Sequence, residues 1–370
     1  MSMNAAYTRR AFAAGVLCLP LVYGTAASAA ADARYGQILD RYFNAGHFDG
    51  IVLLARGDRT MYRGAIGLAN RERPLAHDVD ERFRIASVTK QFTALLVMQE
   101  VERGSIDLDA PISAYLPALP HEVAAITMRQ LLKNTSGLPN LDAIPNAYTR
   151  TDGTFDDLPA YVKTLPLTPL LAGPGTKFSY NNLDFLIAGA ILQSVTARPF
   201  GVLVRERITD KLGMRSTGVY GSTIPDSDVK GYELSGKTLV PEKIDRLQNF
   251  GPSGAMYSTL EDMRLWDRAL LRGRLLGRSA TREMFAADNA FGYVALGSWS
   301  YDLRVAGRGQ RVHCIERQGN IGGIQILNLI APEQDIALIV MANTDYADLF
   351  NTYSGRGLPY DLLGEALPEA

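Results

Sequence analysis

The residues that could do chemistry begin with a serine and a lysine three positions apart, Ser87 and Lys90. Apolar residues follow at helical spacing, so both side chains are expected on one face near the N-terminus of a helix. A serine hydroxyl is a weak nucleophile unless a base takes its proton, and a buried lysine with a lowered pKa can be that base. Amide N–H groups at a helix N-terminus also favour a developing oxyanion. The spacing therefore predicts a nucleophile and its base.

The same spacing recurs at Ser227 and Lys230. That pair lies between a proline and a glycine, and no apolar helical run follows it, so nothing would hold its two side chains on one face. We interpret it as a chance match. For Ser87 and Lys90 themselves, spacing and helical context leave one alternative open, a helix-capping serine beside a solvated lysine.

A tyrosine and an asparagine form the second candidate group, Tyr180 and Asn182. They follow a turn rich in proline and glycine and precede an apolar helical segment, which places them on a loop just before a helix N-terminus near Leu183. A tyrosine hydroxyl beside a lysine ammonium ionises more easily and can relay protons, while an asparagine amide can bind a substrate carbonyl. The alternative is a buried tyrosine with Asn182 as the helix cap.

Other kinds of reaction centre fit the sequence less well. Ser253 lies in a segment that partly matches a nucleophile elbow, and Asp302 and His313 follow in the chain order of an α/β-hydrolase. However, Ala255 replaces the last glycine of that motif, and no convincing strand precedes it. The four histidines are scattered without metal-ligand spacing, and neither a phosphate loop nor a dinucleotide-binding motif occurs. We therefore expect a reaction that uses no metal and no cofactor.

The elements that must position these residues follow the order strands, helices, strands. Residues 50–56 and 60–68 predict one hairpin, and residues 323–330 and 335–341 predict another. A small further hairpin is expected over 232–240. We expect strands from both ends of the chain to share one antiparallel sheet, with the helical middle as a large insertion packed on it. The expected helices cover residues 88–103, 128–134, 183–196, 200–212 and 260–271.

The order of these motifs resembles that of a known family. The pattern of Ser87 and Lys90 at the start of an apolar helix, Tyr180 and Asn182 later in the chain, and a Gly-rich strand near the C-terminus is similar to the serine β-lactamase and penicillin-binding protein superfamily. The class C β-lactamase, DD-peptidase and esterase branch is the most similar. The resemblance covers residues 37–344. Family-like segments occur in the expected order at residues 83–87, 131–139, 173–182 and 251–259.

The resemblance implies an α/β fold of the β-lactamase and transpeptidase type and a reaction through an acyl-enzyme. Ser87 would be the nucleophile that carries the acyl group, and Lys90 would be its base. Tyr180 would relay protons and later help to activate the deacylating water. Asn182 would orient the amide on the acyl side of the substrate.

The third motif of the family is where this sequence departs from the pattern. The usual form is Lys or His, then Thr or Ser, then Gly; this chain has Arg317, Gln318 and Gly319. Arg317 keeps a positive charge but cannot donate a proton near neutral pH, and Gln318 replaces a hydroxyl that family members use on a substrate carboxylate. Gly319 still permits close approach of a ligand, and the backbone N–H of Asn320 would complete the oxyanion hole with that of the nucleophile. The alternative for Arg317 is a strand-edge cation paired with Glu316 or with another nearby acid.

Residues 1–29 predict a signal peptide rather than part of the fold. Arg9 and Arg10 precede an apolar run over residues 11–22, and small residues at 27–29 suit a signal peptidase. The paired arginines also resemble a twin-arginine export signal. A retained anchor is disfavoured, because about 12 apolar residues fall short of the ~20 that span a bilayer. We therefore expect export to the periplasm, no stable membrane insertion after cleavage, and a single domain over residues 30–370.

Composition narrows the function further. The 370 residues carry 38 basic and 39 acidic side chains, a formal net charge of −1, which argues against a nucleic-acid partner. Of the two cysteines, Cys18 lies in the expected signal and Cys314 remains, which excludes a disulfide scaffold. We expect a periplasmic serine hydrolase that acts on small ester, amide or D-amino-acid peptide substrates. The alternatives are a class C-like β-lactamase, which the changed third motif disfavours, and a penicillin-binding sensor that acylates without turnover.

Overall fold

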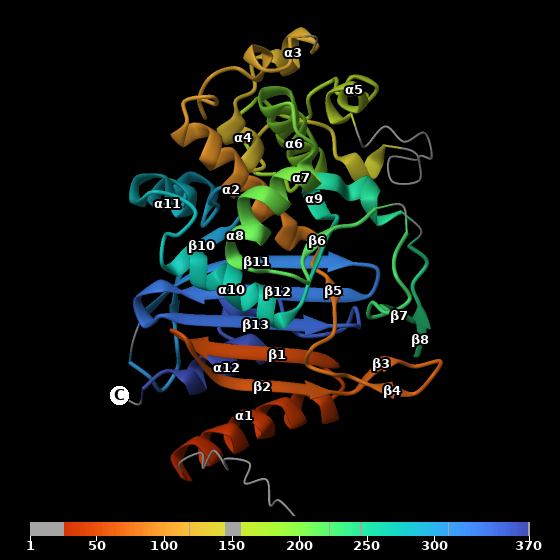
Figure 1. Cartoon of the computed structure of the whole chain (residues 1–370), viewed down its shortest axis with the longest axis vertical. Helices are drawn as coiled ribbons and strands as arrows, with labels where there is room; N and C mark the ends of the chain where they lie inside the picture. The colour runs from red at the N-terminus through yellow and green to blue at the C-terminus, as the bar shows by residue number, and fades with distance from the viewer. Residues whose placement is uncertain are drawn as a thin grey trace, which may run out of the picture.

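A computed structural model shows a central sheet with helices on both faces (Figure 1). The structure describes residues 26–368 except 118, 145–156, 222, 245 and 310, so most of the expected signal peptide lies outside the described residues. The strands of the central sheet are β1 (Gly50–Arg56), β2 (Arg59–Ile66), β10 (Trp299–Arg304), β11 (Arg311–Ile321), β12 (Ile324–Ala331) and β13 (Ile336–Ala342). Their order is β10-β11-β12-β13-β1-β2, and every neighbouring pair is antiparallel. N-terminal and C-terminal strands thus share one sheet, as expected.

Strands β12 and β13 are mainly apolar on both faces, so helices must pack on both sides of the sheet. Every residue of β12 and β13 is buried. Side chains alternate between the faces of a strand. Ile339 and Met341 of β13 accordingly pack toward the central helices, whereas Leu338 and Val340 pack toward the helices at the two ends of the described chain. Those terminal helices, α1 (Ala26–Asn44) and α12 (Leu358–Ala366), contact each other across this second face.

The middle of the chain supplies the helical layer on the first face. Its helices are α2 (Thr89–Glu102), α3 (His121–Ala124), α4 (Met128–Leu132), α5 (Leu158–Lys163), α6 (Asn182–Thr196), α7 (Phe200–Val204), α8 (Asp210–Leu212), α9 (Gly251–Gly254), α10 (Leu260–Leu271) and α11 (Arg278–Phe285). Helix α2 is buried from its first residue through Glu100, because α6, α9 and α11 surround it. The expected helix over 200–212 is interrupted by a π-helical turn at Arg205–Thr209 between α7 and α8.

Short strands form three further small sheets in the described part of the chain. The hairpin β7 (Tyr232–Ser235) and β8 (Thr238–Pro241) confirms the one expected over 232–240. A second hairpin pairs β3 (Leu68–Asn70) with β4 (Leu75–Ala76). A further small sheet has the order β5-β9-β6, and its bounds are β5 (Phe83–Arg84), β9 (Met256–Ser258) and β6 (Gly218–Val219). This small sheet matters for function because β5 leads directly into the segment that carries Ser87.

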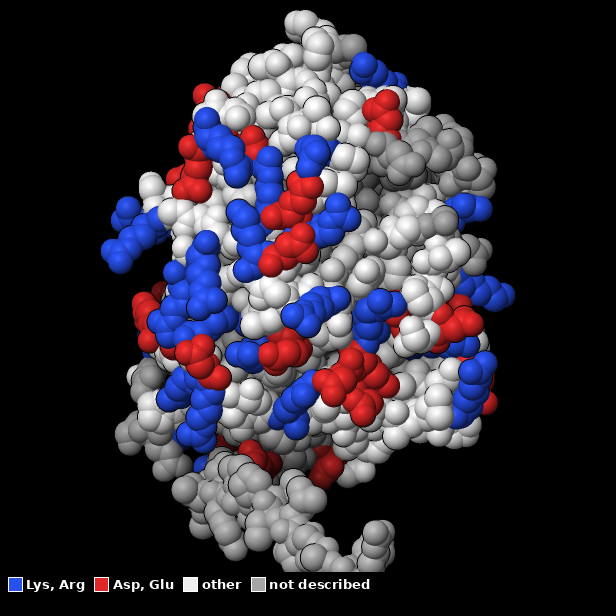
Figure 2. All heavy atoms as spheres, viewed as in Figure 1, with Lys and Arg blue, Asp and Glu red and all other residues white. Residues whose placement is uncertain are grey.

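Two surface properties bear on the expected partners. On the face shown in Figure 2, basic and acidic side chains are interspersed, in keeping with the near-zero net charge. In the described part of the chain no single helix is long and apolar enough to cross a membrane. Helix α6 and the segment Phe200–Leu212 reach the required length and apolarity only together, as a pair bent by 77°.

A buried histidine lies just after the β3–β4 hairpin. The side chain of His77 is fully buried, with Nδ1 2.6 Å from Glu81 Oε2 and Nε2 3.3 Å from Asp49 Oδ1. Burial lowers the pKa of His77, but hydrogen bonds and charge from the two carboxylates outweigh it and raise the pKa to about 9. Since this folded-state pKa lies above the unfolded value of about 6.5, protonated His77 stabilises the fold below pH 6.5. That stability is lost as the pH rises through about 9.

We therefore expect the His77→Gln variant to be less stable than the wild type at pH 6, by up to about 3 kcal/mol. The difference should shrink as the pH approaches 9.5, because wild-type His77 then loses its proton in the folded state too. Urea unfolding of both proteins at pH 6, 7.5 and 9.5 measures it. A difference that stays constant with pH would contradict the assignment of charge to His77.

Candidate active site

Ser87 and Lys90 meet where the helical layer joins the sheet. Ser87 lies in a short 3-10 helix, Ala86–Val88, that runs directly into α2, so the expected place at a helix N-terminus is confirmed. The ammonium of Lys90 donates hydrogen bonds to Ser87 Oγ at 2.9 Å, to Asn182 Oδ1 at 2.7 Å and to the carbonyl of Ser253 at 2.7 Å. Three acceptors thus fix the lysine against the serine hydroxyl, and the alternative of a solvated lysine is wrong.

The environment of Lys90 favours its neutral form. The side chain is completely buried, and among the described residues no carboxylate forms a salt bridge with it. Burial lowers the pKa of Lys90 to about 8, and the charge of Arg317 adds to this effect while Tyr180 opposes it. A substantial fraction of Lys90 is therefore neutral at mildly alkaline pH, and in that state its amine can accept the proton of Ser87.

Tyr180 completes a hydrogen-bonded group of three. Its hydroxyl is hydrogen-bonded to Ser87 Oγ and accepts a bond from Arg317 Nη2 at 3.2 Å. Lys90 Nζ lies 4.9 Å from the centre of the tyrosine ring. Burial opposes ionisation of Tyr180, but the charges of Lys90 and Arg317 overcome it and lower the tyrosine pKa to about 8. Ser87, Lys90 and Tyr180 can therefore pass protons among themselves.

The helix cap beside the site is Asn181 and not Asn182. The side chain of Asn181 accepts a hydrogen bond from the backbone N–H of Leu183 at 2.9 Å, and Asn182 is the first residue of α6. The expectation that Asn182 lies on the preceding loop is therefore wrong by one residue, because its neighbour supplies the cap. Asn182 instead directs its amide toward Lys90 and toward Asp142, whose Oδ1 accepts a bond from Asn182 Nδ2 at 3.4 Å.

A buried polar cluster holds this loop in place. Asp184, in the first turn of α6, accepts hydrogen bonds from Ser136 Oγ at 2.6 Å and from Asn134 Nδ2 at 2.8 Å. Asn134 Nδ2 also donates to the carbonyl of Asn181 at 2.9 Å. Burial raises the pKa of Asp184 to about 7, although these hydrogen bonds oppose the shift. The segment 131–139 therefore fixes the start of α6, and with it the position of Asn182.

Strand β11 brings Arg317 to the nucleophile. Its guanidinium donates from Nε to the carbonyl of Ser87 at 3.1 Å and lies 5.1 Å from the centre of the Trp299 ring. The alternative, a salt bridge to Glu316 or another nearby acid, is wrong, because Arg317 forms none with any residue that the structure describes. Glu316 in particular is out of reach, since successive side chains of a strand point to opposite faces. Burial lowers the pKa of Arg317, but Tyr180 and Glu316 oppose this. The guanidinium is therefore a fixed charge beside the reacting hydroxyl.

The rest of the third motif lines the same cavity as Ser87. A Cβ at Gly319 would lie 2.5 Å from the carbonyl of Ile85 and 3.2 Å from the nitrogen of Ser87, so glycine allows β11 to approach the nucleophile. Gln318 Nε2 donates to Glu316 Oε1 at 2.6 Å, so this amide is held by the protein itself. Asn320 lines the same cavity as Ser87, and its part in an oxyanion hole stays a prediction.

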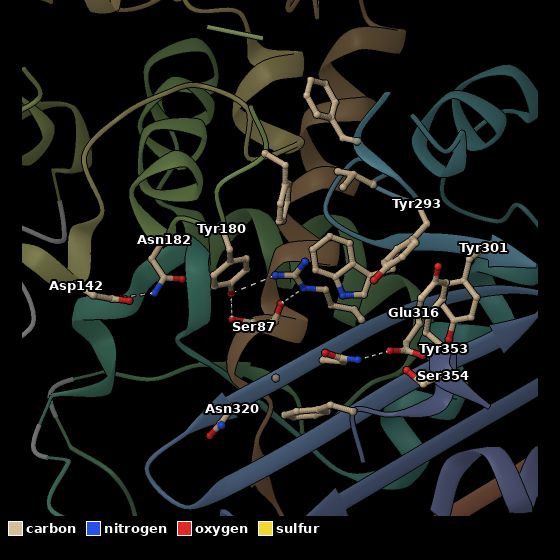
Figure 3. A pocket seen from close by; sticks show the side chains of 18 residues that line it. Ser87, Asp142, Tyr180, Asn182, Tyr293, Tyr301, Glu316, Asn320, Tyr353 and Ser354 are labelled. Carbon is tan, nitrogen blue, oxygen red and sulfur yellow. Dashed lines mark hydrogen bonds between the residues drawn. The ribbon is translucent and has the colours of Figure 1, made fainter. Parts of the chain in front are cut away.

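A cavity of about 660 Å³ opens in front of Ser87 (Figure 3). Every predicted site residue lines it except Lys90, which lies behind the serine. Sequence reasoning missed many of the other residues that line the cavity, although the aromatic enrichment of residues 291–301 was a signal that could have been used. The missed residues are Asp142, Phe178, Phe291, Tyr293, Val294, Trp299, Tyr301, Glu316, Phe350, Tyr353 and Ser354.

The competing nucleophile arrangements are not assembled. Ser253 Oγ donates to the carbonyl of Phe250 at 2.5 Å, whereas Asp302 and His313 pair with each other at 3.0 Å. At the second Ser-x-x-Lys match, the ammonium of Lys230 pairs with a surface glutamate. These residues do not line the cavity around Ser87.

We expect kcat/KM for a neutral ester to rise about tenfold per pH unit below pH 8 and to level off above it. The pKa values of Lys90 and Tyr180 are both lowered to about 8, and the two groups are coupled through Ser87, so the profile reports an ionisation of the pair. Initial rates between pH 6 and 9.5 measure it. A profile that is flat across this range would contradict a proton acceptor with these properties.

The fold and the sequence together define the class of this protein. The chain belongs to the Beta-lactamase family, whose model matches residues 35–355. It is therefore a serine hydrolase, with the antiparallel sheet and helical insertion that this family implies.

Three similar proteins show the range of the family. EstB of Burkholderia gladioli, named an esterase, is 34% identical over 203 residues, which are 50% of this chain and 51% of EstB. PbpX of Bacillus subtilis (strain 168), named as a penicillin-binding protein, is 26% identical over 316 residues, 83% of this chain and 73% of PbpX. The crystal structure of a D-stereospecific amidohydrolase from Streptomyces sp. is similar with a TM-score of 0.74 at 27% identity, covering 88% of this chain and 97% of the amidohydrolase.

Proposed function

We propose that the protein hydrolyses small esters and amides, including amides and peptides of D-amino acids, through an acyl-enzyme at Ser87. The observation that carries the proposal is the hydrogen-bonded group of Ser87, Lys90 and Tyr180 at the wall of a cavity large enough for a small substrate. Similarity to an esterase and to a D-stereospecific amidohydrolase supports this substrate class.

The acylation step follows from the positions of the protons. Neutral Lys90 accepts the proton of Ser87 Oγ as the oxygen attacks the substrate carbonyl carbon. The resulting oxyanion is stabilised by the backbone N–H groups of Ser87 and Asn320. When the bond to the leaving group breaks, the hydroxyl of Tyr180 gives its proton to the departing oxygen or nitrogen. The Lys90 ammonium then returns a proton to the tyrosine.

Deacylation uses the same groups in the opposite direction. Tyr180 first gives its proton to neutral Lys90, and the resulting phenolate takes a proton from a water molecule as the water oxygen attacks the carbonyl carbon of the ester on Ser87. When the ester bond breaks, the Lys90 ammonium returns a proton to Ser87 Oγ. The charges of Lys90 and Arg317 keep the phenolate of Tyr180 accessible near pH 8, because they lower the tyrosine pKa against the effect of burial. Asn182, fixed by its bond from Lys90, is placed to bind an amide on the acyl side of the substrate.

The groups near the third motif disfavour an efficient β-lactamase. The guanidinium of Arg317 is already bound to the carbonyl of Ser87 and to the hydroxyl of Tyr180. The amide of Gln318 is bound to Glu316. A carboxylate on the leaving group, as β-lactams carry, would have to displace these contacts before either side chain could bind it. We therefore propose slow β-lactam turnover at most.

A panel of three substrates tests the proposal: a 4-nitrophenyl ester of a short acid, a D-Ala-D-Ala peptide and nitrocefin. Each is given to the wild type and to the Ser87→Ala variant. We expect sustained hydrolysis of the ester or the peptide by the wild type, slow or no turnover of nitrocefin, and loss of all activities in the variant. A burst of one product equivalent without a steady state would instead identify a sensor, and rapid nitrocefin hydrolysis would identify a β-lactamase.

We also propose that the protein works in the periplasm. The paired arginines, the apolar run and the small residues of the first 29 positions support this location. Fractionation of cells that produce the full chain, with the N-terminus of the mature protein sequenced, tests it. A protein that stays in the cytoplasm with residues 1–29 attached would overturn the proposal.

A further inference from the structure

The cavity has two unlike sides. In Figure 3, Asn182 and Asp142 lie on one side of Ser87 and Tyr180, whereas Tyr293, Tyr301, Glu316 and Tyr353 lie together on the other. Strand β10 begins at Trp299, opposite Glu316 of β11. The following residues of β11 therefore have no partner in β10, and both Glu316 and Arg317 of β11 line the cavity there.

Aromatic rings enclose the second side, which we call the aromatic chamber: Tyr293, Trp299, Tyr301, Tyr353 and the carboxylate of Glu316. The Tyr293 ring lies 4.3 Å from the Tyr353 ring, 5.6 Å from the Tyr301 ring and 6.0 Å from the Trp299 ring, measured between centres. Tyr301 and Tyr353 meet edge to face at 5.3 Å. Faces of electron-rich rings attract cations that have lost part of their water.

Glu316 gives the aromatic chamber an anionic wall. It is 1% exposed, and its carboxylate accepts hydrogen bonds from the Tyr301 hydroxyl and from Gln318 Nε2. It forms no salt bridge with any residue that the structure describes. A carboxylate has about four acceptor positions, so these two bonds leave capacity for a further donor. Burial raises the pKa of Glu316 to about 7, and a bound cation would favour the ionised form.

Arg317 does not take the place of that cation. It projects from the opposite face of β11, where its guanidinium is bound to the carbonyl of Ser87 and to the hydroxyl of Tyr180. The Trp299 ring lies beside this guanidinium and also contacts Tyr293. Trp299 therefore forms a link between the reacting centre and the aromatic chamber.

The leaving group is the part of the substrate that would reach the aromatic chamber. Tyr180 protonates the leaving group in the proposed mechanism, and the tyrosine hydroxyl contacts Arg317, which in turn lies over Trp299. The acyl side is served by Asn182, which lies toward Asp142 on the other side of Ser87. A leaving group bound beside Tyr180 thus extends past Trp299.

We propose that the aromatic chamber is a subsite for an alkylammonium group on the leaving side of the substrate, bound by the tyrosine rings and the carboxylate of Glu316. The inference rests on the proposed function, because it assigns a substrate class to the same reaction centre. The preferred substrates are then esters or amides of amino alcohols or diamines.

Acetylcholine and 3,3-dimethylbutyl acetate test the inference. The two esters have the same shape around a central nitrogen or carbon, and both give the same acetyl-enzyme, so a difference in kcat/KM arises from the leaving group alone. Choline is intrinsically the better leaving group, so the reference is the Glu316→Gln variant. The quantity compared is kcat/KM for acetylcholine divided by kcat/KM for 3,3-dimethylbutyl acetate. We expect this ratio to be about tenfold lower in Glu316→Gln than in the wild type. Acid release at constant pH 8.5 measures the rates.

Two further variants complete the design. Asp142→Asn removes the other carboxylate of the cavity, on the acyl side, and should leave the ratio of the two esters unchanged. Tyr353→Ala removes a ring whose residue is 51% exposed, so it should fold normally and lower the ratio about threefold. Hydrolysis of the neutral ester shows whether Glu316→Gln is folded. If that variant is not folded, the ratio measured for Tyr353→Ala tests the subsite instead.

The outcomes separate the two proposals. A ratio that falls in Glu316→Gln but not in Asp142→Asn supports the alkylammonium subsite. An unchanged ratio in Glu316→Gln, or an equal fall in both variants, overturns it. If the wild type hydrolyses 4-nitrophenyl acetate through Ser87 but neither aliphatic ester, the subsite is overturned and the proposed function stands. If it does not hydrolyse 4-nitrophenyl acetate either, both proposals fail.

Discussion

Replacing Ser87 with alanine is expected to lower ester hydrolysis by about 10⁴-fold or more. The methyl group leaves the proton acceptors in place but removes the oxygen that forms the acyl bond. Ser253, the competing candidate, does not replace it, because its hydroxyl donates to a backbone carbonyl and does not line the cavity. Steady-state rates with a 4-nitrophenyl ester measure the loss.

The second Ser-x-x-Lys match offers a matched control. Ser227→Ala makes the same chemical change in the loop before Lys230, whose ammonium pairs with a glutamate on the surface. This variant should keep the wild-type rate. Comparable losses in Ser87→Ala and Ser227→Ala would show that the reaction does not depend on the group around Lys90.

Replacing Lys90 with methionine is expected to lower kcat/KM by about 10³-fold. Methionine has a similar length, so it fills the buried space but cannot accept the proton of Ser87. The change also removes a positive charge beside Tyr180 and should move the tyrosine pKa upward, since the charge of Lys90 contributes to lowering it. The remaining activity should therefore level off at a higher pH than the wild-type activity does.

The pH profile separates this account from a loss of structure. The thermal unfolding temperature of Lys90→Met should stay near that of the wild type, because a buried charge is exchanged for an apolar side chain of similar volume. Lys230→Met serves as the control on the surface and should keep both rate and profile. A Lys90→Met enzyme with more than a tenth of the wild-type kcat/KM would contradict the role of Lys90 as the base.

Local sequence patterns were sufficient to predict much of the fold. The apolar spacing after Ser87 predicted α2, and the alternating or apolar runs at the two ends predicted four strands of the central sheet, because these signals depend on residues close in the chain. The residue that caps α6 was more difficult to predict. Asn181 and Asn182 are adjacent and of the same type, and only their packing against the segment 131–139 decides which one caps the helix.

Contacts between distant segments could not be predicted in the same way. The partner of Arg317 depends on which face of β11 meets Ser87, so the sequence left a pairing with Glu316 open. Asp142 and Tyr353 join the cavity from loops far from either motif, and no periodic pattern marks them. The raised pKa of His77 similarly depends on Asp49, which only the fold brings near. Tertiary packing, rather than local sequence, determines these features.

The site of covalent attachment tests the central claim most directly. Wild-type protein and the Ser87→Ala variant are each incubated with a serine-directed phosphonate, and intact mass and peptide mapping locate the adduct. We predict a single adduct on the peptide that contains Ser87 in the wild type and none in the variant. An adduct on another residue of the wild type, or labelling that persists in Ser87→Ala, would contradict the assignment of Ser87 as the nucleophile.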